Sequence, residues 1–335
     1  MSMMIKQTPL SEQEMIAEAE KALADISRIR QGVGKVIFGQ ESVVERTLVA
    51  LLAGGHALLV GVPGLAKTKL VETLGIVLGL DARRIQFTPD LMPSDILGSE
   101  VMEQDEHGKR SFRFISGPIF AQLLMADEIN RASPRTQSAL LQSMQEYHVT
   151  VAGARHDLPS PFHVLATQNP LEQEGTYPLP EAQLDRFLMQ IDILYPELDA
   201  ERRILIETTG VEDAKAENVL NPVRLKEIQT LIRRMPVPES VVEAILKLVR
   251  SARPGQGSAE TDKNVAWGPG PRASQALTLC ARARALYDGR LAPSIDDIHA
   301  LAEPVLQHRM ALTFAARAEG MTVRDVVAKL VKAQG

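Results

Sequence analysis

The chain has 335 residues, a formal net charge of −5, 45% apolar residues, 24% charged residues and 4% aromatic residues. These values are ordinary for a globular protein, and they exclude collagen-like, intrinsically disordered and disulfide-framework classes. The length of 335 residues predicts about two domains, each able to bury its own core. The single cysteine, Cys280, cannot form an internal disulfide, which fits a reducing compartment.

The sequence predicts no membrane span and no secretion signal. The longest apolar stretch, residues 48–62, is interrupted by Gly54, Gly55 and His56 and is shorter than the about 18 residues that a span requires. The N-terminal segment MSMMIKQTPLSEQEM lacks the apolar region of a signal peptide. We therefore expect a cytoplasmic protein.

Apolar residues at helical spacing predict helices at both ends of the chain. One helix is expected over residues 11–30. After residue 196, helices are expected at 225–235 and 240–253, followed by a Gly/Pro-rich loop at 255–272 and by two or three helices that end with 322–333. The predicted division is an N-terminal helix at 1–32, a core domain at 33–200 and a helical domain at 201–335.

The core domain alternates short apolar runs with helical stretches, which is typical of an α/β domain with a largely parallel sheet. The expected strands are HALLVG (56–61), RRIQFT (83–88), AQLLMADE (121–128), HVLATQN (163–169) and FLMQIDIL (187–194). Two further segments, 99–115 and 147–159, have the alternation and the turn residues of β-hairpins.

The segment that follows the first predicted strand has the pattern of a phosphate-binding loop. Such a loop needs a strand, a glycine-bearing turn and a helix N-terminus whose N–H groups face the phosphates. Lys67 is then expected to contact the β- and γ-phosphates, and the Thr68 hydroxyl to bind Mg²⁺. The strict pattern has glycine where this chain has Ala66, and the alternative interpretation is a glycine turn in a core. The candidate nucleotide-binding residues here are Gly61, Val62, Pro63, Gly64, Leu65, Ala66, Lys67, Thr68 and Lys69.

Two adjacent carboxylates end the predicted strand 121–128. The carboxyl ends of strands in open α/β sheets are where ligands bind, so Asp127 is expected to hold Mg²⁺ and Glu128 to activate the attacking water as a general base. Taken alone, this pair is more often a solvated strand end. Its position 60 residues after Lys67, with one predicted strand between them, favours the functional interpretation.

Three more polar residues are candidates for catalysis. Asn169, at the end of a predicted strand, is placed to hydrogen-bond the γ-phosphate or the attacking water, although Asn-Pro is also a common turn. Arg186 precedes another strand and Arg272 opens a predicted helix. Arginine stabilises charge on a transferring phosphoryl group, from the same subunit or from a neighbour. Either arginine alone is more often part of a surface ion pair.

These residues form motifs that closely resemble those of the MoxR family of AAA+ ATPases. The matching segments are GVPGLAKT, LLMADEINRASPRTQSALLQSMQE, ATQNP and YPLPEAQLDRF. The resemblance covers most of residues 33–200 and continues more weakly through GPGPRA into the C-terminal helices. It implies an α/β AAA+ core with strand order 5-1-4-3-2 and an all-α lid. Ala66 is the usual residue in this family's version of the loop.

The resemblance also implies roles for individual residues. Asn169 matches the sensor-1 position, Arg272 matches sensor 2, and Arg186 matches the arginine finger that contacts a neighbour's ATP. The adenine base is expected to contact Ile37, Phe38, Gly39 and Gln40. The hairpins at 99–115 and 147–159 match the helix-2 insert and the pre-sensor-1 hairpin, which magnesium chelatase motor subunits share. For Arg131 and Arg135 the resemblance is silent, and neither is assigned a role.

The leading functional interpretation is a Mg²⁺-dependent ATPase that assembles as a ring, most simply a hexamer, and remodels a protein partner. In this family the partner is commonly a protein with a von Willebrand A domain, and the outcome is maturation or metal loading of an enzyme complex. The alternatives are a motor acting on nucleic acid, a chelatase-type motor subunit and a nucleotide-binding scaffold without turnover. The insert tip, with Glu103, Asp105 and Glu106 against Lys109 and Arg110, disfavours nucleic acid. The chain contains no Asn-Lys-x-Asp motif for guanine.

Overall fold

The computed structural model describes residues 12–104, 106–107, 109–172, 175–208 and 215–334. The first 11 residues of the predicted N-terminal segment 1–32 lie outside this part of the chain. No helix within the described residues combines the length and the apolar composition needed to cross a bilayer.

Five parallel strands form the central sheet in the order β2-β5-β8-β1-β9. They are β1 (Ala57–Val60), β2 (Ala82–Gln86), β5 (Leu123–Asp127), β8 (His163–Gln168) and β9 (Met189–Asp192). Numbered along the chain, these five strands have the order 5-1-4-3-2 read from the other edge. The predicted fold class is therefore confirmed, and each strand lies in the segment that was expected to contain it, except that β2 begins one residue earlier, at Ala82.

The sheet is covered on both faces because apolar side chains alternate along its strands. Leu59 packs into one apolar cluster with the helices that precede and follow β1, while the adjacent Leu58 packs into a second cluster on the opposite face with α5. The helices of the core are α1 (Glu12–Gly34), α2 (Glu41–Leu52), α3 (Lys67–Leu78), α4 (Pro93–Leu97), α5 (Pro134–Glu146), α6 (Glu181–Leu184) and α7 (Leu198–Thr208), with a 3-10 turn, η1 (Ile129–Arg131).

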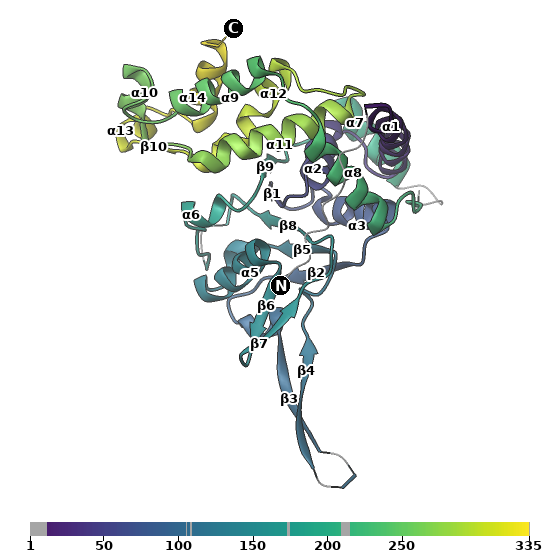
Figure 1. Cartoon of the computed structure of the whole chain (residues 1–335). Coiled ribbons are helices and arrows are strands. Elements are labelled where there is room, and N and C mark those ends of the chain that lie inside the picture. Colours follow the sequence, from purple (N-terminus) through teal and green to yellow (C-terminus); the bar gives the residue numbers. More distant parts are fainter. Residues whose placement is uncertain (1–11, 105, 108, 173–174, 209–214, 335) are drawn as a thin grey trace.

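Two antiparallel hairpins extend from the α5 side of the core. The first pairs β3 (Gly98–Gln104) with β4 (Arg110–Ser116), and the second pairs β6 (His148–Val151) with β7 (Ala154–Asp157). The β3–β4 hairpin projects from the body of the molecule, at the end opposite the C-terminal helices (Figure 1). At its base, the Phe114 ring stacks on the His156 ring of β7 with centroids 3.8 Å apart. The two hairpins therefore touch near the core.

The C-terminal region is a helical lid that packs against α1 and α2. Its elements are α8 (Pro222–Arg234), α9 (Glu239–Ser251), α10 (Ala259–Asn264), β10 (Val265–Trp267), α11 (Pro271–Tyr287), α12 (Ile295–Leu306), η2 (Gln307–Arg309), β11 (Ala311–Leu312), α13 (Phe314–Ala318) and α14 (Val323–Lys332). Cys280 is buried within α11 as a free thiol.

The expected loop at 255–272 is wrong in its middle, where the structure has α10 and β10. Ser258 caps α10 by accepting a hydrogen bond from the Thr261 N–H. The strand β10 pairs with β11, more than 40 residues further along the chain. A strand whose partner is so remote leaves no local sequence signal for the pairing. The many glycines and prolines of the segment therefore led to the prediction of a loop. The lid is consequently helical apart from this two-stranded ribbon.

Two buried histidines join the sheet to α5 and to the lid. The His56 Nε2–H donates to a backbone carbonyl of α5, and its Nδ1 accepts from a backbone N–H of β8. The His163 Nδ1–H donates to the Gly55 carbonyl, and its Nε2 accepts from the Gln229 amide of α8. Each ring thus uses one nitrogen as donor and one as acceptor, which only the neutral form can do. Burial lowers the pKa of His56 to about 3 and the pKa of His163 to about 4.

We expect the free energy of unfolding to fall as the pH drops from about 6.5 toward 4. In this range the unfolded histidines bind protons and the folded ones do not, so each contributes a slope of up to about 1.4 kcal/mol per pH unit. Urea unfolding between pH 8 and pH 4.5 measures the slope. His163→Gln is expected to lose part of the slope below pH 6.5, whatever its constant effect at pH 8. A variant with the wild-type slope would contradict this role of His163.

Candidate functional site

The loop between β1 and α3 is shaped by three backbone positions. A Cβ atom at Gly61 would lie 2.9 Å from the Ile193 carbonyl oxygen, so only glycine fits beside the end of β9. Gly64 and Ala66 both have positive φ angles, +84° and +54°. The left-handed region favours glycine, and for alanine it costs on the order of 1 kcal/mol. This explains why the strict motif has glycine at the position of Ala66. The left-handed conformation of Ala66 leads the chain directly into α3.

Lys67, the first residue of α3, places its ammonium group inside this loop. Its Nζ donates to the carbonyl oxygens of Gly61, at 2.5 Å, and Val62, at 2.8 Å. Burial lowers the pKa of Lys67, while the nearby carboxylates of Asp127 and Glu128 act in the opposite direction. The loop therefore holds a cation at the N-terminus of a helix, which is a favourable place for a phosphate group.

The separate sequence signals meet at one cavity of about 430 Å³. It is lined by Pro63, Gly64, Leu65, Ala66, Lys67, Thr68, Lys69, Asp127, Glu128, Thr167 and Asn169. The carboxyl ends of β1, β5 and β8 converge here, as parallel strands require. The structure thus brings together the phosphate loop, the acidic pair and Asn169.

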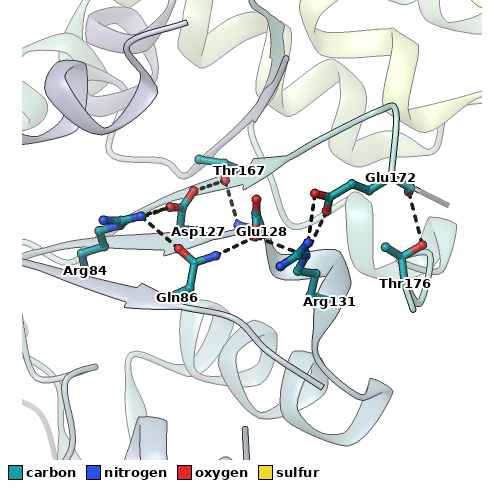
Figure 2. A network of polar contacts seen from close by, with 8 residues as sticks. All are labelled: Arg84, Gln86, Asp127, Glu128, Arg131, Thr167, Glu172 and Thr176. Atoms are coloured by element: carbon teal, nitrogen blue, oxygen red, sulfur yellow. Dashed lines mark hydrogen bonds and ion pairs between the residues drawn. The ribbon is translucent and has the colours of Figure 1, made fainter. Parts of the chain in front are cut away.

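Thr167 of β8 ties the acidic pair together (Figure 2). Its buried hydroxyl donates to Asp127 Oδ1 at 2.6 Å, and the hydroxyl oxygen of Thr167 accepts from the Glu128 backbone N–H at 2.8 Å. Glu128 needs this support because it has a positive φ of +55°. The turn directs the chain away from the sheet immediately after Asp127, so that both side chains line the cavity.

Two residues of β2 contact the same carboxylates, and the sequence interpretation did not include either of them. Arg84 pairs with Asp127 Oδ2 through Nη2 at 2.5 Å and Nε at 3.1 Å. The Gln86 amide donates to Glu128 Oε2 at 2.7 Å. The available signal was the segment RRIQFT, in which long polar side chains occupy a strand of an otherwise apolar sheet. The partners are more than 40 residues away, so spacing alone did not reveal them.

Arg131 continues the network on the other side of Glu128, as Figure 2 shows. Its guanidinium binds both carboxylate oxygens of Glu172, at 2.9 and 3.0 Å, and lies 3.3 Å from Glu128 Oε2. The hydrogen bond to Glu172 raises the pKa of Arg131. Glu172 follows Asn169 by three residues, so Arg131 links the two strand ends. Arg135, the other unassigned arginine, is exposed on α5.

The predicted adenine segment lies beside the phosphate loop and not in the 430 Å³ cavity. The buried Gln40 amide donates to the Leu65 carbonyl at 3.1 Å, which fastens the segment to the loop. Phe38 has the Arg203 guanidinium of α7 at 5.3 Å from its ring centroid. Gly39 has a φ of +68°, and α7 lies close against it. Ile37 is buried. These four residues thus form a short wall between the loop and α7.

The structure places Arg186 and Arg272 together, away from the phosphate loop. Both line a second cavity of about 270 Å³, into which Arg233 and Arg309 also face, with Asp185 as the single carboxylate among the lining residues. Burial lowers the pKa of Arg186, and the positive charge of Arg272 lowers it further. The Arg186 Nε–H is buried without a partner among the described residues. Neither arginine lines the cavity that contains Lys67.

The oxygen donors at the first cavity fit Mg²⁺. Mg²⁺ is usually held by one or two protein oxygens together with waters and substrate phosphates. The Thr68 hydroxyl and the Asp127 carboxylate both line the cavity and are donors of this kind. The described residues contain no cluster of three or more His, Cys, Asp or Glu side chains that would form an all-protein metal cage.

The parallel sheet, phosphate loop and helical lid are those of the AAA class of ATPases, and comparison with known proteins agrees. The model of the ATPase family associated with various cellular activities (AAA) matches residues 56–189, and that of the AAA lid domain matches residues 258–330. Chaperone MoxR1 of Mycobacterium tuberculosis is 42% identical over 319 residues, which cover 94% of this chain and 84% of that protein.

Two further relatives extend this result. Protein MoxR of Methylorubrum extorquens is 30% identical over 306 residues, covering 85% of this chain and 87% of the relative. A crystal structure of a candidate ATPase from Cytophaga hutchinsonii has a TM-score of 0.87 and 37% identity, covering 96% of this chain and 97% of that one. The chain belongs to the MoxR family of AAA+ ATPases.

Proposed function

We propose that this chain hydrolyses ATP and uses the energy for chaperone-like remodelling of a protein partner. The observation that supports hydrolysis most directly is the 430 Å³ cavity, because it combines a helix N-terminus and a cation with two carboxylates. A site that only bound nucleotide would need the helix N-terminus and the cation but not the two carboxylates. The scaffold without turnover is therefore the weaker interpretation.

Each group at the cavity has a chemical task in this proposal. Lys67 and the loop N–H groups bind the phosphates, and Thr68 and Asp127 hold Mg²⁺. When bound, Mg²⁺ neutralises charge on the phosphate oxygens. Glu128 accepts a proton from the attacking water, and Asn169 orients that water or the γ-phosphate. Gln86 and Arg131 hold the Glu128 carboxylate from two sides, which keeps it in one position.

Substitution of Lys67 and Glu128 should separate binding from turnover. Lys67→Ala is expected to abolish ATP binding, because it removes the main positive charge on the phosphates. Glu128→Gln is expected to retain binding and to lower turnover by ~10²–10⁴-fold, the usual effect of removing a general base. Calorimetry measures binding, and phosphate release measures turnover.

Glu72→Gln is the matched control for Glu128→Gln. Glu72 is exposed on α3, the helix that follows the loop, so the same chemical change there should leave binding and turnover unchanged. If Glu128→Gln turned over ATP at the wild-type rate, Glu128 would not be the base.

We further propose that Arg186 and Arg272 act on the nucleotide of a neighbouring subunit. They share a cavity that holds four arginines and one carboxylate, a surplus of positive charge that suits an anion. The phosphate loop of the same chain does not line that cavity. A head-to-tail contact that brings one cavity onto the other closes into a ring when its rotation permits. A hexamer is the expected ring.

Mixing of inactive subunits tests this arrangement. Arg186→Ala subunits retain Lys67, and Lys67→Ala subunits retain Arg186, so about a quarter of interfaces in a random 1:1 ring combine both intact residues. We expect part of the ATPase activity to return on mixing. Lys67→Ala mixed with Glu128→Gln is the control, because every site then carries a defect in its own subunit. If no ratio of Arg186→Ala to Lys67→Ala restored activity, the action in trans would be wrong.

The β3–β4 hairpin is the proposed contact for the protein partner, a protein with a von Willebrand A domain or a metalloenzyme complex. Met102 and Phe112 face each other across the two strands and are 53% and 71% exposed. Exposed apolar side chains that adjoin one another on a surface are a feature of interaction sites. The hairpin base stacks on β7 through Phe114 and His156, and β7 leads into β8, which ends beside Asn169. The proposed partner contact is therefore connected to Asn169 through the β6–β7 hairpin.

A nucleic-acid motor and a chelatase-type motor subunit are the alternatives. The exposed apolar pair on the hairpin and the acidic hairpin tip favour a protein partner over a nucleic acid, because nucleic-acid binding depends on surplus Lys and Arg. A chelatase-type motor subunit would share the hairpins, but the similarity to MoxR proteins favours a MoxR-type function over it.

The double variant Met102→Ser/Phe112→Ser should separate partner contact from ATPase activity. Basal turnover is expected to persist, because neither residue lines the cavity, while stimulation by a purified von Willebrand A domain protein of the same organism is lost. Leu246→Ser/Leu291→Ser, at two exposed leucines of the lid, is the control and should keep the stimulation. If DNA stimulated the intact protein and the hairpin variant lost that effect, the nucleic-acid motor would replace our proposal.

A further inference from the structure

Arg309, in the 3-10 turn η2 of the lid, is almost completely buried at 2% exposure. Its Nε–H donates to Asp185 Oδ1 at 2.7 Å. Its two terminal nitrogens donate to the carbonyl oxygens of Asp185, Phe187 and Leu188, at distances from 2.7 to 3.3 Å. These acceptors belong to the core segment 185–188, which also contains Arg186. One buried lid side chain thus holds the backbone on both sides of Arg186.

The two preceding residues of η2 bind the same segment. The His308 Nε2–H donates to the Phe187 carbonyl at 3.1 Å, and burial keeps the pKa of His308 well below its usual value, so the ring is neutral. The Gln307 amide donates to the Gln190 carbonyl at 3.0 Å. All three side chains of the turn therefore fasten the lid to residues 185–190. A displacement of the lid is carried to this segment through several hydrogen bonds at once.

Asp185 connects this anchor to the second functional arginine. Its Oδ1 accepts from Arg309, and its Oδ2 accepts from Arg272 Nη1 at 3.5 Å. The carboxylate lies between like charges that otherwise repel, since the Arg272 charge lowers the pKa of both Arg186 and Arg309. Without Asp185, three guanidinium groups would face one another at the cavity. The carboxylate thus allows Arg186 and Arg272 to stay close together.

A purely structural explanation of Arg309 is weaker. Burying an ion pair is a poor source of stability, because desolvation offsets the attraction, and apolar residues of similar size often serve as well or better. What the pair supplies is geometry, since a planar guanidinium with fixed donor directions defines where its acceptors lie. The Arg186 Nε has no partner among the described residues, and the backbone on both sides of Arg186 is held by Arg309.

We propose that Arg309 is a positioning residue that sets Arg186 and Arg272 for a neighbour's nucleotide and makes their position depend on the lid. This inference rests on the proposed action of the two arginines in trans. Arg309 contacts no nucleotide in this scheme. It acts only through Asp185 and the carbonyl groups around Arg186.

Mixed rings test the inference, because they separate the subunit that donates the arginines from the subunit that binds ATP. The donor carries Lys67→Ala and the acceptor carries Arg186→Ala. Adding Arg309→Met to the donor is expected to lower the restored kcat by about tenfold to a hundredfold, the effect of a misplacement of about 1 Å. The KM for ATP should not change, since the acceptor's phosphate loop is intact. Adding Arg309→Met to the acceptor should leave the restored rate unchanged, because Arg186 is already absent there.

A general loss of stability would not produce this asymmetry between donor and acceptor. The control is Asp297→Asn in the donor, which disturbs a buried lid carboxylate bound by Arg284 at 2.6 Å and by Arg290 at 2.7 Å, away from residues 185–190. Asp297→Asn should give the same restored rate whether it is placed in the donor or in the acceptor subunit. Asp185→Asn keeps the side-chain shape and should reproduce the asymmetry of Arg309→Met, so the test holds even if Arg309→Met fails to fold. Size-exclusion chromatography verifies that each mixture forms rings.

Two results would overturn the proposal, and they are distinguishable. If the mixture of Lys67→Ala and Arg186→Ala restored no activity even before Arg309 is changed, the action in trans would fail, and the positioning role with it. If that mixture restored activity, but Arg309→Met and Asp185→Asn lowered it equally in donor and acceptor, the action in trans would stand and the positioning role alone would be wrong.

Discussion

Two residues other than glycine, Ala66 and Glu128, adopt left-handed backbone angles where β1 and β5 give way to the next element. Such angles cost on the order of 1 kcal/mol each and persist only when the surroundings hold them. At Ala66 the turn aims the first N–H groups of α3 at the cavity, and at Glu128 it directs the carboxylate beside Asp127 toward the same space. The strand between them, β8, supports the turn at Glu128 through the Thr167 hydroxyl. The rest of the site depends on this geometry, because Lys67, Asp127 and Glu128 converge only if both turns are kept.

The sequence was sufficient for the features that depend on local patterns. Four of the five parallel strands are short apolar runs and were located as such. The strand β2 was located too, although only Ile85 among its residues is buried. The phosphate loop has a fixed spacing that identified Lys67 and Thr68. The contacts of Arg84, Gln86 and Glu172 could not be found this way, because their partners lie about 40 residues away in the chain. For the same reason the ribbon of β10 and β11 was missed. What sequence patterns do not supply is the register of one strand against another, and the side-chain pairs across the sheet follow from that register.

The distribution of charge makes a single chain incomplete as a catalyst under the proposed mechanism. The phosphate loop cavity has carboxylates and lysines but no arginine among its lining residues, whereas the second cavity has four arginines and one carboxylate. Desolvated arginines that repel one another are an unfavourable arrangement in isolation, and an anion from outside the chain relieves it. Assembly and phosphate binding therefore favour each other. A free subunit, which lacks the neighbour's arginines, is expected to hydrolyse ATP slowly, and this limits wasteful turnover before the ring has formed.

Two different parts of the molecule adjoin the strands that carry the reacting groups. The β6–β7 hairpin leads into β8, which ends beside Asn169, and the β3–β4 hairpin stacks on it through Phe114 and His156. The lid turn η2 binds the segment that leads into β9 and carries Arg186. Both connections consist of stacked rings and hydrogen bonds to backbone, which transmit small displacements because packed interiors deform little. In the proposed mechanism, a change in phosphate contacts at Asn169 is carried to the hairpins of the same subunit, while a change at Arg186 in response to the neighbour's nucleotide is carried to its own lid. Because the two inputs come from different nucleotides, a subunit in the proposed ring combines the state of its own site with that of the adjacent one.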